Sequence, residues 1–376
     1  MRSDSRTIRF LLPCVLAFVS QPNLARSQDS APPTWSPKAA ANYLDERAEW
    51  WLGWPSAGRG QGTACVSCHT TMPFALARPA LGARLGETNA SALETKLVEN
   101  VKKRVANWDK IVVEAPGGKD PFTPFYQGKR RLDSLGTEAV LNALLLVNND
   151  AIRAKGVLSE PTRKSLDHLW GQQRDTGAWR WLDFGLRPWE TDGDYLGASL
   201  AAIAVGTAGA DYYDRSDIKP KAAALRAYLR TQFANQSLHN RAMGLWASSK
   251  LPDVLSDGDK KRLIEELAGI QEADGGWRLA SLGKSGGDWK SHGLYPEAAI
   301  SDGYATGLVV LALRRGGVPN DDAKLKKAIA WLSTRQIDGT WPTAYINRAR
   351  NPRDDIGKFM RDAATAFAVL ALSETE

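Results

Sequence analysis

Three short segments of this 376-residue chain share one theme: a glutamine, then an aspartate, then a glycine, then a tryptophan. They occupy residues 169–179, 270–277 and 335–341. The glycine predicts a turn with positive φ that ends the preceding helix. We expect the Gln amide to bond to backbone near the turn and the Trp ring to pack over the next helix. Repeated turns of this kind predict a chain built from stapled helical repeats.

The segments between these turns alternate between two kinds of helix pattern. Helices rich in small and aliphatic residues are predicted at 69–81, 137–147, 194–205, 240–248, 302–313 and 362–372. More highly charged amphipathic helices are predicted at 39–51, 92–108, 161–173, 219–232, 257–271 and 322–336. Their spacing of roughly 45–70 residues is typical of helical repeat arrays. We predict an all-α fold of about six inner and six outer helices.

The Gln–Trp turns resemble those of the squalene–hopene cyclases and protein prenyltransferase β subunits. The resemblance covers residues 39–374 and implies an α/α toroid, that is, a closed ring of helix pairs around a central cavity. In this family the cavity holds an isoprenoid chain, so the resemblance implies an apolar ligand. It also implies polar residues at the mouth formed by the amino ends of the inner helices.

An acidic pair stands where hopene cyclases carry their catalytic Asp-x-Asp-Asp motif. Asp192-Gly193-Asp194-Tyr195 matches that motif in part, with Tyr195 in place of the last Asp. The resemblance implies Asp194, together with Asp192, as a general acid that protonates an alkene, which requires a neutral carboxyl group in a dry pocket. The alternative is that either residue caps a helix, as we expect for Asp302.

The amino-terminal residues 1–27 have the layout of a signal peptide. A basic start precedes a short apolar core, and small residues follow at the cleavage position. Removal of this segment, with its four Arg and one Asp, lowers the formal net charge from +7 to about +4. We predict a disordered leader at 28–38 and one domain at 39–376, in the periplasm or secreted. Nucleic-acid binding and a transmembrane segment are not expected, and peripheral contact with a membrane stays open.

Cys65-Val66-Ser67-Cys68-His69 forms a C-x-x-C-H motif, and the third cysteine, Cys14, lies in the predicted signal peptide. In an exported chain this motif is the attachment site for c-type haem. Each thiol adds across one vinyl group of the haem, and the adjacent histidine binds the iron from one face. We therefore predict haem c as the cofactor, held by Cys65 and Cys68 with His69 as the proximal ligand.

Three other uses of the two cysteines stay open: a disulfide in an oxidising compartment, part of a zinc site, or a redox-active pair. On the far side of the haem, Met243 is the preferred iron ligand because it falls early on an inner helix. Met360, His239 and His292 are further candidates by residue type, whereas Met72 is too close to His69 in the chain. A methionine on an inner helix is also an ordinary core residue.

These features support three functions. The preferred one is an exported toroid with covalent haem in redox chemistry or electron transfer, acting on an apolar isoprenoid-like ligand or with a periplasmic redox partner. The second is a haem-free cyclase- or prenyltransferase-like enzyme that uses Asp194 as its acid. The third is a non-catalytic binding module with a Cys65–Cys68 disulfide.

Overall fold

The computed structural model describes residues 35–112, 129–191, 193–284, 289, 300–346, 348 and 350–373. The described residues belong to one compact unit. The predicted signal peptide, the candidate acid Asp192 and the candidate ligand His292 therefore lie outside the described residues.

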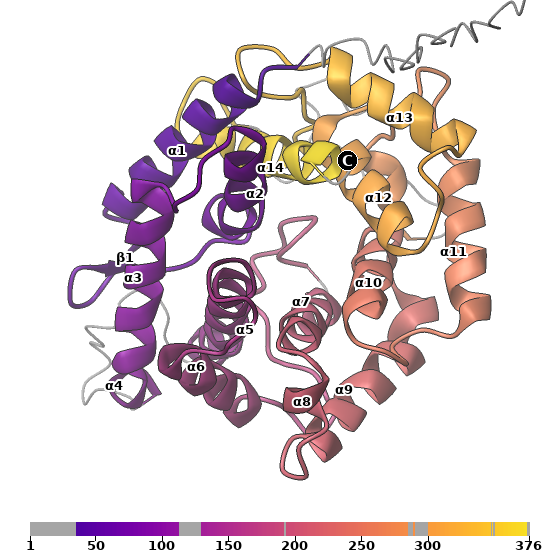
Figure 1. Cartoon of the computed structure of the whole chain (residues 1–376). Coiled ribbons are helices and arrows are strands. Elements are labelled where there is room, and N and C mark those ends of the chain that lie inside the picture. Colours follow the sequence, from indigo (N-terminus) through magenta and orange to yellow (C-terminus); the bar gives the residue numbers. More distant parts are fainter. Residues whose placement is uncertain are drawn as a thin grey trace, which may run out of the picture. The chain divides into compact units, whose positions relative to one another are not determined.

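Six helices of this unit form a closed inner ring, in which each packs against the next and the last packs against the first (Figure 1). In ring order they are α2 (Thr71–Arg84), α5 (Lys129–Arg153), α7 (Asp194–Thr207), α10 (Leu238–Lys250), α12 (Gly303–Arg315) and α14 (Phe359–Ser373). Six further helices lie outside this ring: α1 (Pro37–Gly53), α3 (Ala92–Ala106), α6 (Glu160–Gly171), α9 (Lys219–Gln232), α11 (Asp257–Gly269) and α13 (Ala323–Thr334). Within the described residues this is an α/α toroid, and the predicted fold is confirmed.

The remaining elements of the described residues are short and lie in connections. They are two helices, α4 (Trp108–Val112) and α8 (Ala210–Tyr213), three 3-10 turns (Phe233–Asn235, Ala280–Leu282 and Ile356–Lys358), and the antiparallel strands β1 (Gly58–Arg59) and β2 (Thr63–Ala64). None of the described helices combines the length and the apolar character needed to cross a membrane.

Burial separates the two rings as the composition of their helices predicts. Helices α7, α12 and α14 bury residues on nearly every face. Outer helix α9 buries only Ala222, Leu225 and Leu229, a single stripe at helical spacing. The inner ring is therefore buried on nearly all sides, and the outer helices shield it from solvent.

The glutamines of the first two repeated turns each bridge their own turn and the start of another outer helix. The Nε2 of Gln271 donates to the carbonyl oxygens of Gly275 and Lys324, both at 2.8 Å. Gln173 does the same with Gly177 and Lys221. The third glutamine, Gln336, is discussed next, because it joins the two ends of the array. The predicted stapling role of these amides is confirmed.

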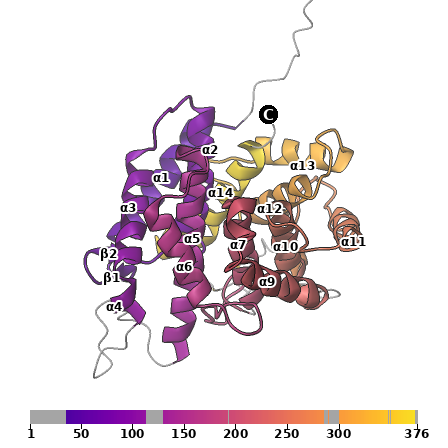
Figure 2. The same ribbon diagram turned by 60° about the horizontal axis from the view of Figure 1, so that its bottom comes forward.

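Gln336 joins the last outer helix to the first. Its Oε1 accepts from the backbone N–H of Ser36 at 2.6 Å, and its Nε2 donates to the Ser36 carbonyl at 3.1 Å. Figure 2 shows the same meeting of the two ends, with α14 beside α1 and α2. The ring is thus closed by the same turn chemistry that links its internal repeats.

The tryptophan of each turn is completely buried and is fixed by its indole N–H. Trp179, Trp277 and Trp341 donate to carbonyl oxygens at the end of the preceding helix, at 2.7, 2.8 and 2.7 Å. Each ring is therefore anchored to the helix before the turn. The glycines Gly177, Gly275 and Gly339 have the positive φ values that the sequence predicts.

Three boundaries differ from the sequence prediction. Trp35 is buried, Ser36 caps α1 and Pro37 starts it, so the folded part begins inside the predicted leader. Helix α5 extends well beyond 137–147, because its polar ends, which interrupt the apolar pattern, are themselves buried or bonded. Helix α3 ends at Ala106, and a turn at Asn107 separates it from α4.

Candidate functional site

The C-x-x-C-H segment lies between strand β2 and helix α2, where neighbouring elements fix its backbone. The side chain of Asn100 on α3 accepts from the N–H of Ala64 and donates to its carbonyl, at 2.7 and 2.9 Å. The indole N–H of Trp51 on α1 donates to the carbonyl of Cys65 at 2.7 Å. The segment is therefore held on both sides before α2 begins.

His69 is packed among aromatic rings from three different parts of the chain. Its ring stacks on Phe359 with centroids 3.9 Å apart, and the ring of Trp51 meets it edge-on at 5.1 Å. Trp189, in the loop before α7, lies at 5.9 Å. Burial lowers the pKa of His69 to about 3, and the nearby charges of Arg350 and Arg47 act in the same direction. The imidazole is therefore neutral at physiological pH.

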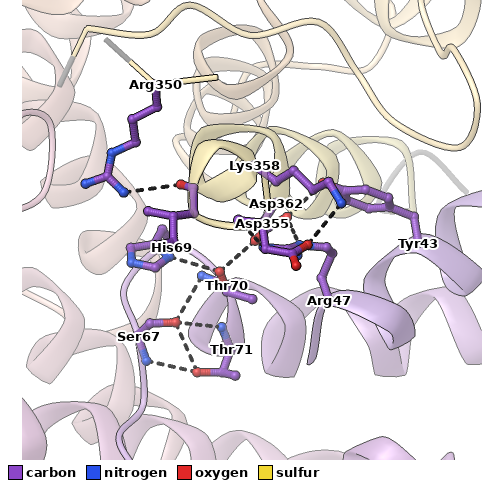
Figure 3. A network of polar contacts seen from close by, with 11 residues as sticks. Tyr43, Arg47, Ser67, His69, Thr70, Thr71, Arg350, Asp355, Lys358 and Asp362 are labelled. Atoms are coloured by element: carbon purple, nitrogen blue, oxygen red, sulfur yellow. Dashed lines mark hydrogen bonds and ion pairs between the residues drawn. The ribbon is translucent and has the colours of Figure 1, made fainter. Parts of the chain in front are cut away.

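A hydrogen-bonded relay determines which nitrogen of His69 carries the proton. The hydroxyl of Thr70 donates to the carboxylate of Asp362 at 2.7 Å and lies 2.9 Å from His69 Nδ1 (Figure 3). Because the single hydroxyl hydrogen goes to Asp362, Nδ1 must donate its own hydrogen to the Thr70 oxygen. Nε2 then carries the lone pair, which is the state that metal binding or proton acceptance requires.

Asp362 on α14 is the centre of a buried polar cluster at the amino end of this helix. It accepts from Arg47 Nε and from the Tyr43 hydroxyl, both at 2.8 Å, as well as from Thr70. Arg47 also pairs with Asp355 at 2.8 Å (Figure 3). Burial raises the pKa of Asp362, and the charge of Arg47 and the three hydrogen bonds oppose that rise. The carboxylate therefore holds α1, α2 and α14 together next to His69.

Cys65, Cys68 and His69 line one cavity, which we call the thiol cavity. Its volume is about 80 Å³, and its other walls are Trp51, Val66, Ser67, Ser134, Thr137, Glu138, Leu182, Phe184 and Glu190. Burial raises the pKa of Glu190 to about 7; the charges of Arg350 and Arg348 oppose the rise, and that of Asp183 adds to it. Glu138 is instead bonded by Arg104 at 2.7 and 2.8 Å.

The two thiols are free in this structure, so it does not support the predicted alternative of a disulfide. Burial raises the pKa of both Cys65 and Cys68, which keeps them protonated and disfavours a thiolate nucleophile or redox pair. Among the described residues no three His, Cys, Asp or Glu side chains are grouped so as to hold a metal ion. A zinc site here is likewise unsupported.

The donor set fits the attachment of haem. Two thiols and one imidazole line the same cavity, and the imidazole has the tautomer whose Nε2 can bind iron. The enclosed volume of about 80 Å³ is smaller than the roughly 300–1,000 Å³ of most cofactor pockets, so the thiol cavity can enclose only part of the group.

The predicted ligands for the far side of the iron do not line the thiol cavity. Met243 is buried in the core on α10, and Met360 is also a core residue. Both ring nitrogens of His239 are occupied, at 3.0 Å from Asn240 Oδ1 and 2.8 Å from the Tyr304 hydroxyl. The thiol cavity therefore brings together the two cysteines and His69, and none of these three candidates lines it.

Asp194 lies apart from the thiol cavity, and its surroundings are not the dry pocket that a catalytic acid of the cyclase type requires. It begins α7 and pairs with Arg174 at 2.9 Å, with 42% of its side chain exposed. Gly193 occupies the cap position, so Asp194 is not the helix cap either. Asp302 does cap α12, as expected, by accepting from the N–H of Ala305 at 2.9 Å. Burial raises the pKa of Asp194 and the charge of Arg174 opposes that rise, but a side chain this exposed lacks the dry pocket that an acid protonating an alkene requires.

A second cavity of about 930 Å³, which we call the polar cavity, lies at the amino ends of α7 and α10. Its walls include Asp133, Arg174, Arg180, Asp183, Arg187, Asp194, Gln236, Asn240 and Lys284, together with Trp181, Tyr195, Tyr228 and Trp289. Polar residues at this mouth agree with the expectation from the toroid resemblance. A lining of arginines and carboxylates favours a polar ligand over a hydrocarbon chain.

Three residues of the thiol site were not identified from the sequence: Thr70, Asp362 and Glu190. Thr70 directly follows the motif, so its position next to His69 could have identified it as part of the site. Asp362 was predicted only as the first residue of an inner helix. Glu190 lies 121 positions beyond His69 in the chain, and no pattern in the sequence links the two.

No family model matches the chain, and no curated protein matches it. Among solved structures the chain is similar to ent-copalyl diphosphate synthase from Streptomyces platensis, at 15% identity and a TM-score of 0.37, over 89% of this chain and 68% of that one. It is also similar to a family 88 glycosyl hydrolase from Bacteroides vulgatus, at 12% identity and a TM-score of 0.33, over 93% of this chain and 95% of that one. At these values the similarity carries no argument about activity or ligand.

Proposed function

We propose that the protein is an exported redox protein that carries one covalently attached haem on Cys65 and Cys68, with His69 as an iron ligand. The orientation of His69 carries the proposal, because the Thr70–Asp362 relay leaves its Nε2 lone pair free in a residue that lines the same cavity as both thiols. When bound, such a group would supply one-electron oxidation and reduction.

The residues around the motif have separate tasks in this proposal. Phe359 and Trp51 fix the plane of the His69 ring by stacking and edge contact. Thr70 and Asp362 hold the proton on Nδ1, which leaves the lone pair on Nε2. Burial keeps the unreacted thiols protonated, and it thereby protects them from oxidation before attachment.

The signal-like pattern at 1–27 supports a location outside the cytoplasm, where c-type attachment takes place. A redox protein of the same compartment is the partner we propose. The polar cavity supports a polar small molecule as ligand, rather than the isoprenoid-like chain that the toroid resemblance implies. The ion pair and the partial exposure of Asp194 argue against the cyclase hypothesis.

The proposal is tested by expressing the full chain together with a haem-maturation system and purifying it from the exported fraction. We expect a Soret band, a mass raised by one haem, and colour that stays with the polypeptide on a denaturing gel. Cys65→Ser and Cys68→Ser should each weaken covalent retention, and the double variant should abolish it. Met243→Leu is the matched control and should retain both the haem and its spectrum.

A colourless exported protein with an unmodified mass would overturn the proposal. If Cys65 and Cys68 were then found joined to each other, the binding-module hypothesis would replace it. If the haem-free protein instead released a cyclised product from squalene, and lost this activity on Asp194→Asn, the cyclase hypothesis would replace it.

A further inference from the structure

A continuous chain of aromatic rings crosses the toroid from the thiol cavity to the polar cavity. The centroid of His69 lies 5.9 Å from that of Trp189, which lies 5.4 Å from Tyr304 on α12. Tyr304 lies 5.9 Å from His239 on α10, and His239 lies 5.8 Å from Trp289. His69 lines the thiol cavity and Trp289 lines the polar cavity. Every step is within the usual range for ring pairs in contact.

Hydrogen bonds along this chain have one consistent direction. Trp189 Nε1–H donates to the Tyr304 oxygen at 2.9 Å. The amide nitrogen of Asn240 donates to Gln236, so its oxygen accepts from His239 Nδ1–H at 3.0 Å. His239 Nε2 therefore has a lone pair, and it accepts the phenolic hydrogen of Tyr304 at 2.8 Å.

The pairing of a tryptophan donor with an imidazole acceptor distinguishes Tyr304 from three other tyrosines with known partners. Tyr43 donates to the charged carboxylate of Asp362, which Arg47 and Thr70 also bind. Tyr212 also accepts from a tryptophan, Trp170, at 2.8 Å, but no imidazole is bonded to it among the described residues. Tyr195 donates to the carbonyl of Leu229, which is a poor proton acceptor. Of these four tyrosines, Tyr304 is the one whose phenolic hydrogen lies in line with a neutral imidazole.

We propose that Tyr304 is a redox-active tyrosine that relays an oxidising equivalent between the thiol cavity and the polar cavity. In this step Tyr304 gives one electron to a one-electron oxidant, and its O–H bond breaks. The proton passes to His239 Nε2, where a new N–H bond forms, which leaves a neutral phenoxyl radical and an imidazolium. The relay rests on the proposed function, and its cellular oxidant would be a haem held by Cys65, Cys68 and His69 that a peroxide has oxidised above the ferric state, because ferric haem is too weak an oxidant for a phenol.

The resting state of the pair suits this step. Burial raises the pKa of Tyr304 well above that of an ordinary tyrosine, so the phenol keeps its proton until it is oxidised. Burial lowers the pKa of His239 to about 4, with the Asn240 hydrogen bond opposing the change. An oxidised phenol is a far stronger acid than an imidazolium, so even this weakened base accepts the proton.

The test uses flash-quench photo-oxidation of the purified mature protein. Soluble tris(bipyridine)ruthenium(III), generated by light, serves as the one-electron oxidant, and freeze-quench EPR detects the tyrosyl radical. We expect a signal from the wild-type protein that is lost in Tyr304→Phe. His239→Gln should lose it as well, since glutamine keeps an acceptor for the phenol but is not a base. Tyr212→Phe is the matched control and should keep the full signal.

An equal yield of tyrosyl radical in the wild-type protein and Tyr304→Phe would overturn the relay, as would equal losses in Tyr304→Phe and Tyr212→Phe. Thermal unfolding of each variant separates misfolding from a true loss, and His239→Gln serves if Tyr304→Phe does not fold. Because the oxidant is supplied from solution, the test works in protein with or without haem. Failure of the relay is thus distinguished from failure of haem attachment, which the visible spectrum reports.

Discussion

The hydroxyl of Thr70 donates a hydrogen bond of 2.7 Å to the carboxylate of Asp362, although 292 residues separate the two in the chain. Thr70 stands at the start of the first inner helix and Asp362 near the start of the last. The bond therefore forms only when the ring is closed. It links the completed fold to the proton position on His69.

Replacing Thr70 with valine should change the redox behaviour of the attached haem while leaving the fold intact. The variant loses the hydrogen bond to His69 Nδ1, which makes Nε2 a weaker donor to an oxidised metal. We expect the reduction potential to rise by roughly 20–65 mV, the equivalent of about 0.5–1.5 kcal/mol for one hydrogen bond in a one-electron couple. Potentiometric titration measures this. Thr71→Val, which affects Ser67 but not His69, should show no such rise.

Asp362→Ala should destabilise the protein strongly, because it leaves the guanidinium of Arg47 without its buried partner. Both side chains of this pair are 1% exposed. Removal of one member of such a pair costs about 3–5 kcal/mol. Asp355→Ala removes the other carboxylate bound to Arg47, which is 46% exposed, and should cost at most about 1 kcal/mol. Urea unfolding of the two variants compares them, and equal losses would contradict the central role of Asp362.

Gly339→Ala should weaken the closure of the ring by more than its backbone conformation alone explains. Its φ is 80°, and a Cβ would lie 2.5 Å from the carbonyl oxygen of Ala39 on α1. Gly317 has a φ of 91° but open space around it. We expect Gly317→Ala to cost about 1–2 kcal/mol and Gly339→Ala about 1–3 kcal/mol more. Thermal unfolding of the two variants in parallel measures the difference. Similar Tm values would show that α1 shifts to accommodate the Cβ without a loss of stability.

Glu190 should make stability fall as pH rises between about 4.5 and 7. Burial raises its pKa in the folded state to about 7, from an ordinary value of 4.5. The folded state therefore binds more protons than the unfolded state in this window, and ionisation above it costs up to about 3 kcal/mol. Glu190→Gln should be more stable than the wild-type protein at pH 8 and nearly equal to it at pH 4.5. Denaturant midpoints at both values of pH check this, and parallel curves for the two proteins would exclude it.

The ring could be predicted from the sequence because its determinants are local. Each turn Trp bonds to a carbonyl within ten positions, and Gln173 and Gln271 each make one bond only four positions away, so this part of the turn can be recognised along the chain. The small residues of the inner helices likewise reveal burial on every face. The ends of α5 were missed for the opposite reason. Asp150, which looks like a break in the apolar pattern, is buried and accepts from Ser159 and Thr162.

Only the residues of the candidate site that are close together in the sequence could be predicted. Cys65, Cys68 and His69 lie within five positions, and the motif itself indicates their chemistry. Asp362 and Glu190 join them through contacts that only the closed ring creates, and a single sequence carries no pairing information of that range. Met243 was chosen from residue type and helix position, and its side chain proved to belong to the core instead.

The pairing of Gln336 with Ser36 has a consequence for how this chain is made. In an open solenoid each added repeat is stabilised by the one before it, and end repeats protect the exposed faces. Here the first helix waits for a partner 300 positions away, so synthesis must be nearly finished before this end of the ring is covered. Until then the apolar faces that ring closure buries stay exposed, and exposed apolar surface of this kind favours misassembly.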